Sequence, residues 1–224
     1  MISHEKKCIF IHIPKCAGSS IEFFLKQEVN ALGWNKEEGL EYKMRREGLA
    51  KVINLYPHYF TFTFVRNPFA RFVSIWKYSE RMKGYAKQRQ NHYGYRPQEN
   101  LSLKEYANLI KAGDLQQLSG FDTYHTRKQV DFILDFNKET LFGIPRKTQD
   151  NCNFIGRLES LNDDFKVLCQ LLDIKYQTLS HQRNSKRPKH YSEYYDDETV
   201  EIIGELYSED IEFLGYKFTT ETIE

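Results

Sequence analysis

Lys15, Ser19 and Ser20 are the first residues in the chain whose types and spacing could support chemistry. They lie in the segment 14–20, PKCAGSS, directly after an apolar run. The lysine supplies a full positive charge, and small residues let an anion come close to the backbone. If a helix begins here, its free N–H groups also attract anions. The segment predicts a phosphate-binding loop, although its lysine precedes the glycine, unlike GxxxxGK[ST]. The alternative is an ordinary strand-to-helix turn.

The elements around this loop can be predicted from the pattern of apolar residues. The run 8–13, CIFIHI, is typical of a strand buried on both faces, and Pro14 ends it because proline cannot donate to a ladder. Ser19 and Glu22 have the spacing of a capping box, which predicts a helix starting at this point. Its apolar positions recur at helical spacing: Ile21, Phe24 and Leu25.

A second strand-to-helix turn carries Arg66 and Ser74. The run 60–65, FTFTFV, predicts a strand, and residues 69–82 predict a helix with Pro68 near its start, where proline is tolerated. Arg66, Arg71 and Ser74 are polar positions at the beginning of that helix. An arginine at the strand end and a serine in the first turns could converge on one phosphate.

Together the two motifs resemble those of sulfotransferases that use 3′-phosphoadenosine-5′-phosphosulfate (PAPS). IHIPKCAGSS resembles their 5′-phosphosulfate motif, and FTFVRNPFARFVSIWKY, about fifty residues later, resembles their 3′-phosphate motif. The chain is most similar to sulfotransferase family 2, the carbohydrate sulfotransferases, and to its short bacterial members. The resemblance extends over nearly the whole chain, including FIGRLESLNDDF at 154–165 and the tail from residue 190.

The resemblance implies a donor site and its residues. Lys15 would contact the bridging oxygen and the transferring group, and Arg66 suits the 3′-phosphate because its planar fork pairs bidentately with phosphate oxygens. In the basic turn 180–191, Ser185 matches a position near the 3′-phosphate, while Arg183 stands where the family usually has asparagine. The donor-binding residues implied are Lys15, Cys16, Ala17, Gly18, Ser19, Ser20, Arg66, Ser74, Arg183 and Ser185. The product would be adenosine 3′,5′-bisphosphate (PAP), and the acceptor a hydroxyl-bearing molecule, with a saccharide as the family-level expectation.

The general base is the least determined part of the predicted site. An acceptor hydroxyl must lose its proton, commonly to His or Glu. Relatives often carry a histidine about twenty residues before the second motif, but residues 42–47 contain none. His58 is the nearest histidine and is the predicted base. The alternatives are Glu41, Glu47 and His12, and we interpret Glu22 as part of the capping box.

Composition limits the class of protein. With 224 residues and 40% hydrophobic content, the chain is expected to form one domain over 1–224. A net charge of +1 argues against a general nucleic-acid binder. None of the four cysteines has metal-site spacing, so no metal is expected. No apolar run approaches 18 residues, and only seven residues precede the first strand, which favours a cytoplasmic enzyme without a transmembrane segment.

The order of the predicted elements favours an α/β fold, P-loop-like and three-layered, with a mostly parallel central sheet flanked by helices. Both motif loops would emerge at the carboxyl ends of strands, where ligands bind in such folds. Further predicted elements are a helix 103–112 capped by Ser102 and Glu105, a strand 153–156, a helix to about 172 and a last helix 196–208. Two other functions stay open: a nucleotide-binding relative without catalytic activity, and a nucleotide-dependent kinase.

Overall fold

The computed structural model describes residues 1–29, 55–86, 100–113, 120–133, 152–179 and 189–220. The chain divides into two compact units. Unit 1 comprises Met1–Val65 and Gln129–Ser185, and unit 2 comprises Arg66–Lys128 and Lys186–Glu224.

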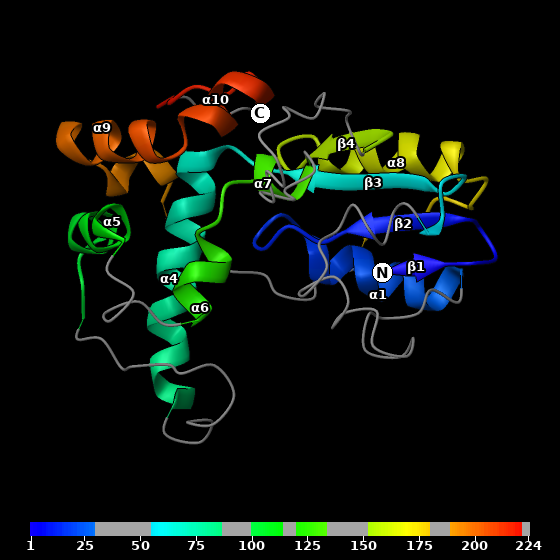
Figure 1. Ribbon diagram of the computed structural model, residues 1–224, viewed down its shortest axis with the longest axis horizontal. Helices are drawn as coiled ribbons and strands as arrows, with labels where there is room; N and C mark the ends of the chain where they lie inside the picture. The colour runs from blue at the N-terminus through cyan, green and yellow to red at the C-terminus, as the bar shows by residue number, and fades with distance from the viewer. Residues whose placement is uncertain (30–54, 87–99, 114–119, 134–151, 180–188, 221–224) are drawn as a thin grey trace, which may run out of the picture. The chain divides into compact units, whose positions relative to one another are not determined.

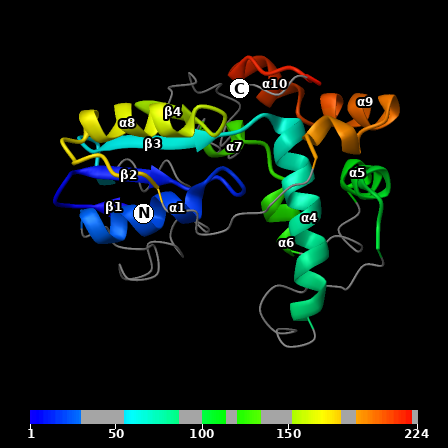
Figure 2. The same ribbon diagram turned by 180° about the vertical axis from the view of Figure 1, so that it is seen from behind.

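Unit 1 contains a four-stranded sheet in the order β1-β2-β3-β4, as Figures 1 and 2 show from opposite sides. The bounds are Ile2–Ser3 for β1, Cys8–Ile11 for β2, Phe60–Val65 for β3 and Phe154–Arg157 for β4. β1 pairs antiparallel with β2, whereas β2, β3 and β4 are parallel, with Ile11 opposite Thr63 and Val65 opposite Arg157. The mostly parallel sheet confirms the predicted α/β class.

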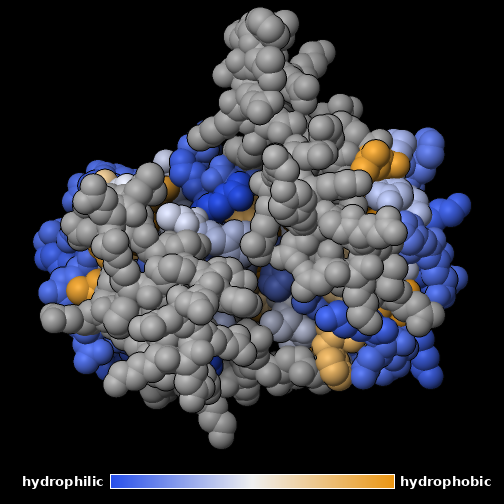
Figure 3. All heavy atoms as spheres, turned by 60° about the horizontal axis from the view of Figure 1, so that its bottom comes forward, coloured by the Kyte–Doolittle hydropathy of each residue, from blue (hydrophilic) through white to orange (hydrophobic). Residues whose placement is uncertain are grey.

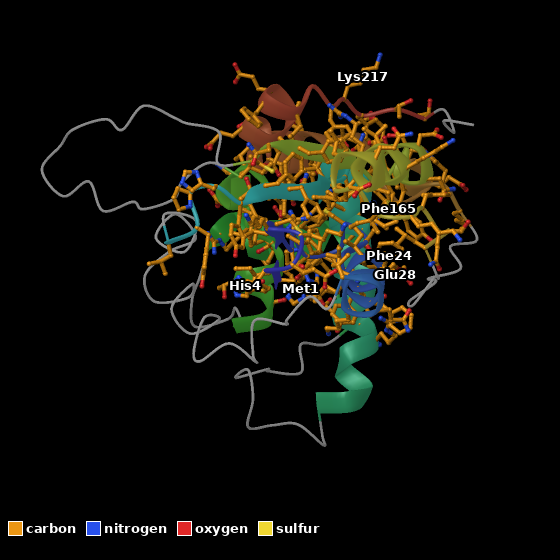
Figure 4. All side chains as sticks on the ribbon, turned by 90° about the vertical axis from the view of Figure 1, so that its right-hand side faces the viewer. Met1, His4, Phe24, Glu28, Phe165 and Lys217 are labelled. Atoms are coloured by element: carbon orange, nitrogen blue, oxygen red, sulfur yellow. The ribbon has the colours of Figure 1, made fainter. Side chains whose placement is uncertain are left out.

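The helices α1 (Gly18–Glu28) and α8 (Leu161–Leu171) share one apolar core with the sheet. Every second residue of the strands faces this core, as the pleat requires: Cys8, Phe10, Phe62 and Phe64. Phe24 of α1 meets Phe165 of α8 edge-to-face, with ring centroids 4.9 Å apart, and both are labelled in Figure 4. This core fixes the start of α1 against the end of β2. Unit 1 also contains the short helix α7 (Val130–Ile133).

Unit 2 is helical in the parts that the structure describes. α4 (Pro68–Ala86) shares a second core with α5 (Leu103–Ala112), α9 (Asp197–Leu206) and the 3₁₀ helix η1 (Tyr191–Tyr194). The remaining helices are α6 (Gly120–His125) and α10 (Ser208–Leu214). Among its described residues, ion pairs near the surface join the elements: Lys104 with Glu198 and Asp196, Lys111 with Glu205 at 2.6 Å, and Lys128 with Glu209.

Most predicted elements are confirmed, and two details of the prediction are wrong. The capping box of Ser102 and Glu105 forms as expected. The first strand ends at Ile11 rather than at residue 13. The predicted box of Ser19 and Glu22 does not form, because α1 already begins at Gly18 after Ala17 and has no side-chain cap. The predicted helix 196–208 is confirmed as α9, and a further helix that the sequence did not predict, α10, follows after Tyr207. The sequence also predicts a helix over residues 38–55, and this range lies almost wholly outside the described residues.

The described surface is mostly hydrophilic on the face shown in Figure 3, and its hydrophobic residues are scattered. Large hydrophobic side chains that are exposed, such as Phe23 and Leu171, come from different helices. None of the helices that the structure describes is both long and apolar enough to span a membrane.

Candidate anion-binding site

The segment between β2 and α1 has an unusual backbone. Lys15 has a φ of 70° and Ala17 a φ of 61°, both in the left-handed region that residues with a Cβ seldom adopt. Backbone that mixes right- and left-handed residues forms concavities lined with N–H groups, which bind anions. The loop between β2 and α1 thus has the local conformation that a phosphate-binding loop needs.

The N-terminus of α1 leaves hydrogen-bond donors open. Ser20 and Ile21 donate their N–H groups to the carbonyl of Ala17, at 3.0 and 3.2 Å. The N–H groups of Gly18 and Ser19 have no acceptor within the described residues, and neither do the hydroxyls of Ser19 and Ser20. No acidic residue lies in the first turn to offset the positive end of the helix dipole. This helix end is therefore suited to an anionic ligand.

Cys16 anchors the middle of the loop. Its side chain is buried, and its thiol donates to Oε1 of Gln129 at 3.3 Å and approaches the carbonyl of Pro14 at 3.7 Å. Only the backbone of Cys16 can therefore serve a ligand in this conformation. The side chain of Lys15, by contrast, is partly exposed.

His12 and Glu22 form a pair that sequence analysis assigned differently. Nδ1 of His12 lies 2.9 Å from Oε1 of Glu22, and the two side chains are 31% and 23% exposed. The imidazole also packs against Gly18, because an ideal Cβ there would lie 2.2 Å from Nε2 of His12. Glu22 therefore binds a residue just after β2 instead of capping its own helix. In the sequence, the alternation of Cys8, Phe10 and His12 was the pattern that could have predicted that His12 points toward α1.

The pKa of Glu22 is below its usual value as a result of opposing effects. Burial raises the pKa. The hydrogen bond from His12 and the charge of His12, with smaller contributions from the N-terminal ammonium and Lys26, lower the pKa by more than burial raises it. Glu22 is therefore a carboxylate at neutral pH and accepts the Nδ1–H of His12.

In unit 2, the start of α4 is capped by Asn67. The Oδ1 atom of Asn67 accepts the N–H of Phe69 at 3.0 Å, and its Nδ2 donates to the carbonyl of Lys217 at 2.9 Å. Arg66 precedes this cap and is partly exposed. Ser74 is only 9% exposed, and its hydroxyl has no hydrogen-bond partner among the residues described. Buried hydroxyl groups usually have a hydrogen-bond partner, so this one is suited to donate a hydrogen bond to an oxygen of a bound ligand.

Arg71 lies in the first turns of α4, as predicted, but its side chain is engaged within the protein. Its side chain is 1% exposed, and its guanidinium donates to the carbonyls of Arg127 and His125, both at 2.9 Å. Arg71 thus donates to carbonyls at and just after the C-terminal end of α6.

The structure does not bring His58 together with Lys15. His58 is exposed in the turn before β3, at the amino end of that strand, whereas Lys15 follows the carboxyl end of β2. The two parallel strands run side by side for about 10 Å between these ends, at 3.3 Å per residue. Glu41, Glu47, Arg183 and Ser185 lie outside the described residues, and the described part of the chain contains no cluster suited to a metal ion.

Comparison with known proteins gives one match. The model of the Sulfotransferase family matches residues 1–217, nearly the whole chain. No curated protein and no solved structure matches it.

Proposed function

The chain belongs to the sulfotransferase family, and we propose that it transfers the sulfuryl group of PAPS to a hydroxyl of an acceptor, most simply a saccharide. The family membership supports sulfuryl transfer in general. The open N-terminus of α1 is the observation that carries the proposal further, because it provides unpaired donors at the position of the 5′-phosphosulfate motif. PAPS supplies the activated sulfuryl group, and the protein supplies binding, orientation and charge.

Each proposed binding residue has a physical role. The N–H groups of Gly18 and Ser19 and the hydroxyls of Ser19 and Ser20 would bind the 5′-phosphosulfate, and Lys15 would offset charge that develops on the leaving phosphate. Arg66 and Ser74 would bind the 3′-phosphate, Arg66 through its charged fork and Ser74 through its buried hydroxyl. The proton of the acceptor hydroxyl must pass to a base, and the position of His58 argues against His58 in that role.

Calorimetric titration with PAP tests donor binding directly. We expect clear binding by the wild-type protein, and a loss of about 2 kcal/mol or more for Arg66→Ala, as for one truncated contact to a charged ligand. Lys15→Ala should also weaken binding. Lys26→Ala, on the exposed side of α1, and Arg81→Ala, exposed on α4, are matched controls that should bind like wild type.

The same titration shows which result would overturn the proposal. A folded wild-type protein that does not bind PAP would exclude PAPS as the donor. Equal losses for Arg66→Ala and Arg81→Ala would show that the binding is general attraction of anions. If PAP binds, transfer of labelled sulfate from PAPS to a panel of saccharides, small alcohols and tyrosine peptides would identify the acceptor class.

A nucleotide-binding relative without catalytic activity is the second candidate. It is favoured by the placement of the predicted base, His58, at the far end of β3 from the loop. Tight PAP binding with no transfer to any acceptor would support it. Transfer that survives in His58→Ala but is lost in Glu41→Gln or Glu47→Gln would instead locate the base outside the described residues.

A further inference from the structure

We propose that His12, held by Glu22, is a positioning residue for the anionic group that binds at the N-terminus of α1, and that its protonation strengthens this binding. The proposal deepens the proposed function and rests on it, since the anion in question is the 5′-phosphosulfate of the donor.

The geometry places the imidazole directly under the first turn of α1. Nδ1 of His12 is bonded to Glu22 at 2.9 Å, and Nε2 lies where a Cβ of Gly18 would otherwise stand. Gly18 and Glu22 are four residues apart and thus lie on one face of the helix. The ring therefore fixes the position of Gly18, whose N–H is one of the two open donors.

The bond to Glu22 also determines which nitrogen can change its protonation. Glu22 is ionised at neutral pH, so the Nδ1–H of His12 donates to it in both states of the ring. Nε2, which has no hydrogen-bond partner among the described residues, is then the nitrogen that gains or loses the proton. A proton gained there is gained beside Gly18.

The charge balance links this proton to an anion. A cation at the N-terminus of a helix is unfavourable by itself, because the helix dipole is already positive there. A bound phosphate makes the interaction of this cation with its surroundings favourable instead. Protonation of His12 therefore raises the affinity for the anion, and the bound anion raises the proton affinity of His12 by the same factor. Besides His12, the charged groups that act on Glu22 are Lys26 on α1 and the amino terminus of Met1, and both are positive. Glu22 is the acidic group that offsets them.

The test compares PAP affinity at pH 6.0 and pH 8.5 for wild type and His12→Gln. Glutamine can still donate to Glu22 but does not titrate in this range, so it removes the proton while keeping the hydrogen bond. We expect wild type to bind about tenfold more tightly than His12→Gln at pH 6.0, as for a titration midpoint raised by one pH unit, and nearly equally at pH 8.5. Because both proteins bind the same ligand, the ratio of their two affinities at each pH does not depend on the titration of the ligand's own phosphates.

Nuclear magnetic resonance of the His12 Cε1–H group gives a second measurement. It is made on the wild-type protein and therefore does not depend on whether a variant folds. The titration midpoint of His12 in wild type should rise on saturation with PAP, whereas that of His4, in the turn after β1, should not. Glu22→Gln should reduce the rise, and Glu28→Gln, at the exposed end of α1 labelled in Figure 4, should not.

The outcomes separate this inference from the proposed function. An affinity ratio that stays constant with pH, or a His12 midpoint that PAP does not move, would overturn the positioning role while leaving the donor assignment intact. Folded wild type that does not bind PAP at either pH would overturn both.

Discussion

The two strand-to-helix turns of the chain use their helix ends in opposite ways. At α1 the preceding residue, Ala17, is left-handed, no side chain caps the helix, and the N–H groups of Gly18 and Ser19 stay open. At α4 the side chain of Asn67 occupies the corresponding place and accepts from Phe69. A phosphate can therefore bind the backbone at α1, whereas at α4 it must be bound by side chains. The difference explains why the first motif consists of small residues and the second contains arginines.

The largest expected effect comes from Arg71, the arginine of the second turn that serves structure. Arg71→Ala would remove a buried side chain together with its hydrogen bonds to the carbonyls of His125 and Arg127, and should lower the free energy of unfolding by about 3 kcal/mol. Urea denaturation measures this change. Arg66→Ala should lower the denaturation midpoint by less than Arg71→Ala, because the side chain of Arg66 is partly exposed. If both variants were equally stable, the division of the two arginines into structural and binding roles would be wrong.

Gly18→Ala tests the close packing at the first turn. The new Cβ would lie 2.2 Å from Nε2 of His12, so the ring or the helix start must shift, at a cost of about 1–3 kcal/mol in stability. We also expect at least a tenfold loss of PAP affinity in calorimetry. Gly204→Ala is the matched control: it lies within α9 with nothing within 4 Å of the new Cβ, and should be neutral or stabilising. Wild-type PAP affinity in Gly18→Ala would count against the role of this turn.

Asn67→Ala removes the cap that distinguishes the second turn. Loss of the bond to Phe69 should cost about 1 kcal/mol of stability, with a further contribution from the bond to Lys217. Thermal unfolding followed by circular dichroism would show the change. Ser19→Ala should produce no comparable loss, since Ser19 does not cap α1.

The smallest expected effect is that of Glu22→Gln on the free energy of unfolding, and it is seen as a difference in how stability changes at acidic pH. Because the pKa of Glu22 is lower in the folded protein than in the unfolded chain, its contribution to stability is present above the unfolded value of about 4.5 and is lost as the pH falls through the folded value. Between pH 7 and pH 3, wild type should therefore lose slightly more stability than Glu22→Gln. Denaturation midpoints that change in parallel would contradict this expectation.

The sequence predicted what depends on neighbours along the chain. The continuous apolar runs identified β2 and β3, and the spacing of Ser102 and Glu105 identified a helix start that forms as expected. The same spacing at Ser19 and Glu22 did not produce a capping box, because His12, ten positions earlier and just after β2, binds the carboxylate. Arg71 could not be distinguished from Arg66, since its partners are carbonyls of α6 and the residues after it, about fifty-five positions further along.

The contact between His12 and Gly18 has a consequence for how this sequence can vary. A side chain at position 18 and an imidazole at position 12 cannot occupy the same space, and Glu22 has its hydrogen-bond partner only while position 12 can donate. Positions 12, 18 and 22 should thus change together among related sequences. Without the histidine, position 18 could hold a larger residue and position 22 would no longer need a carboxylate. An alignment of many related sequences should therefore show correlated substitutions at these three positions.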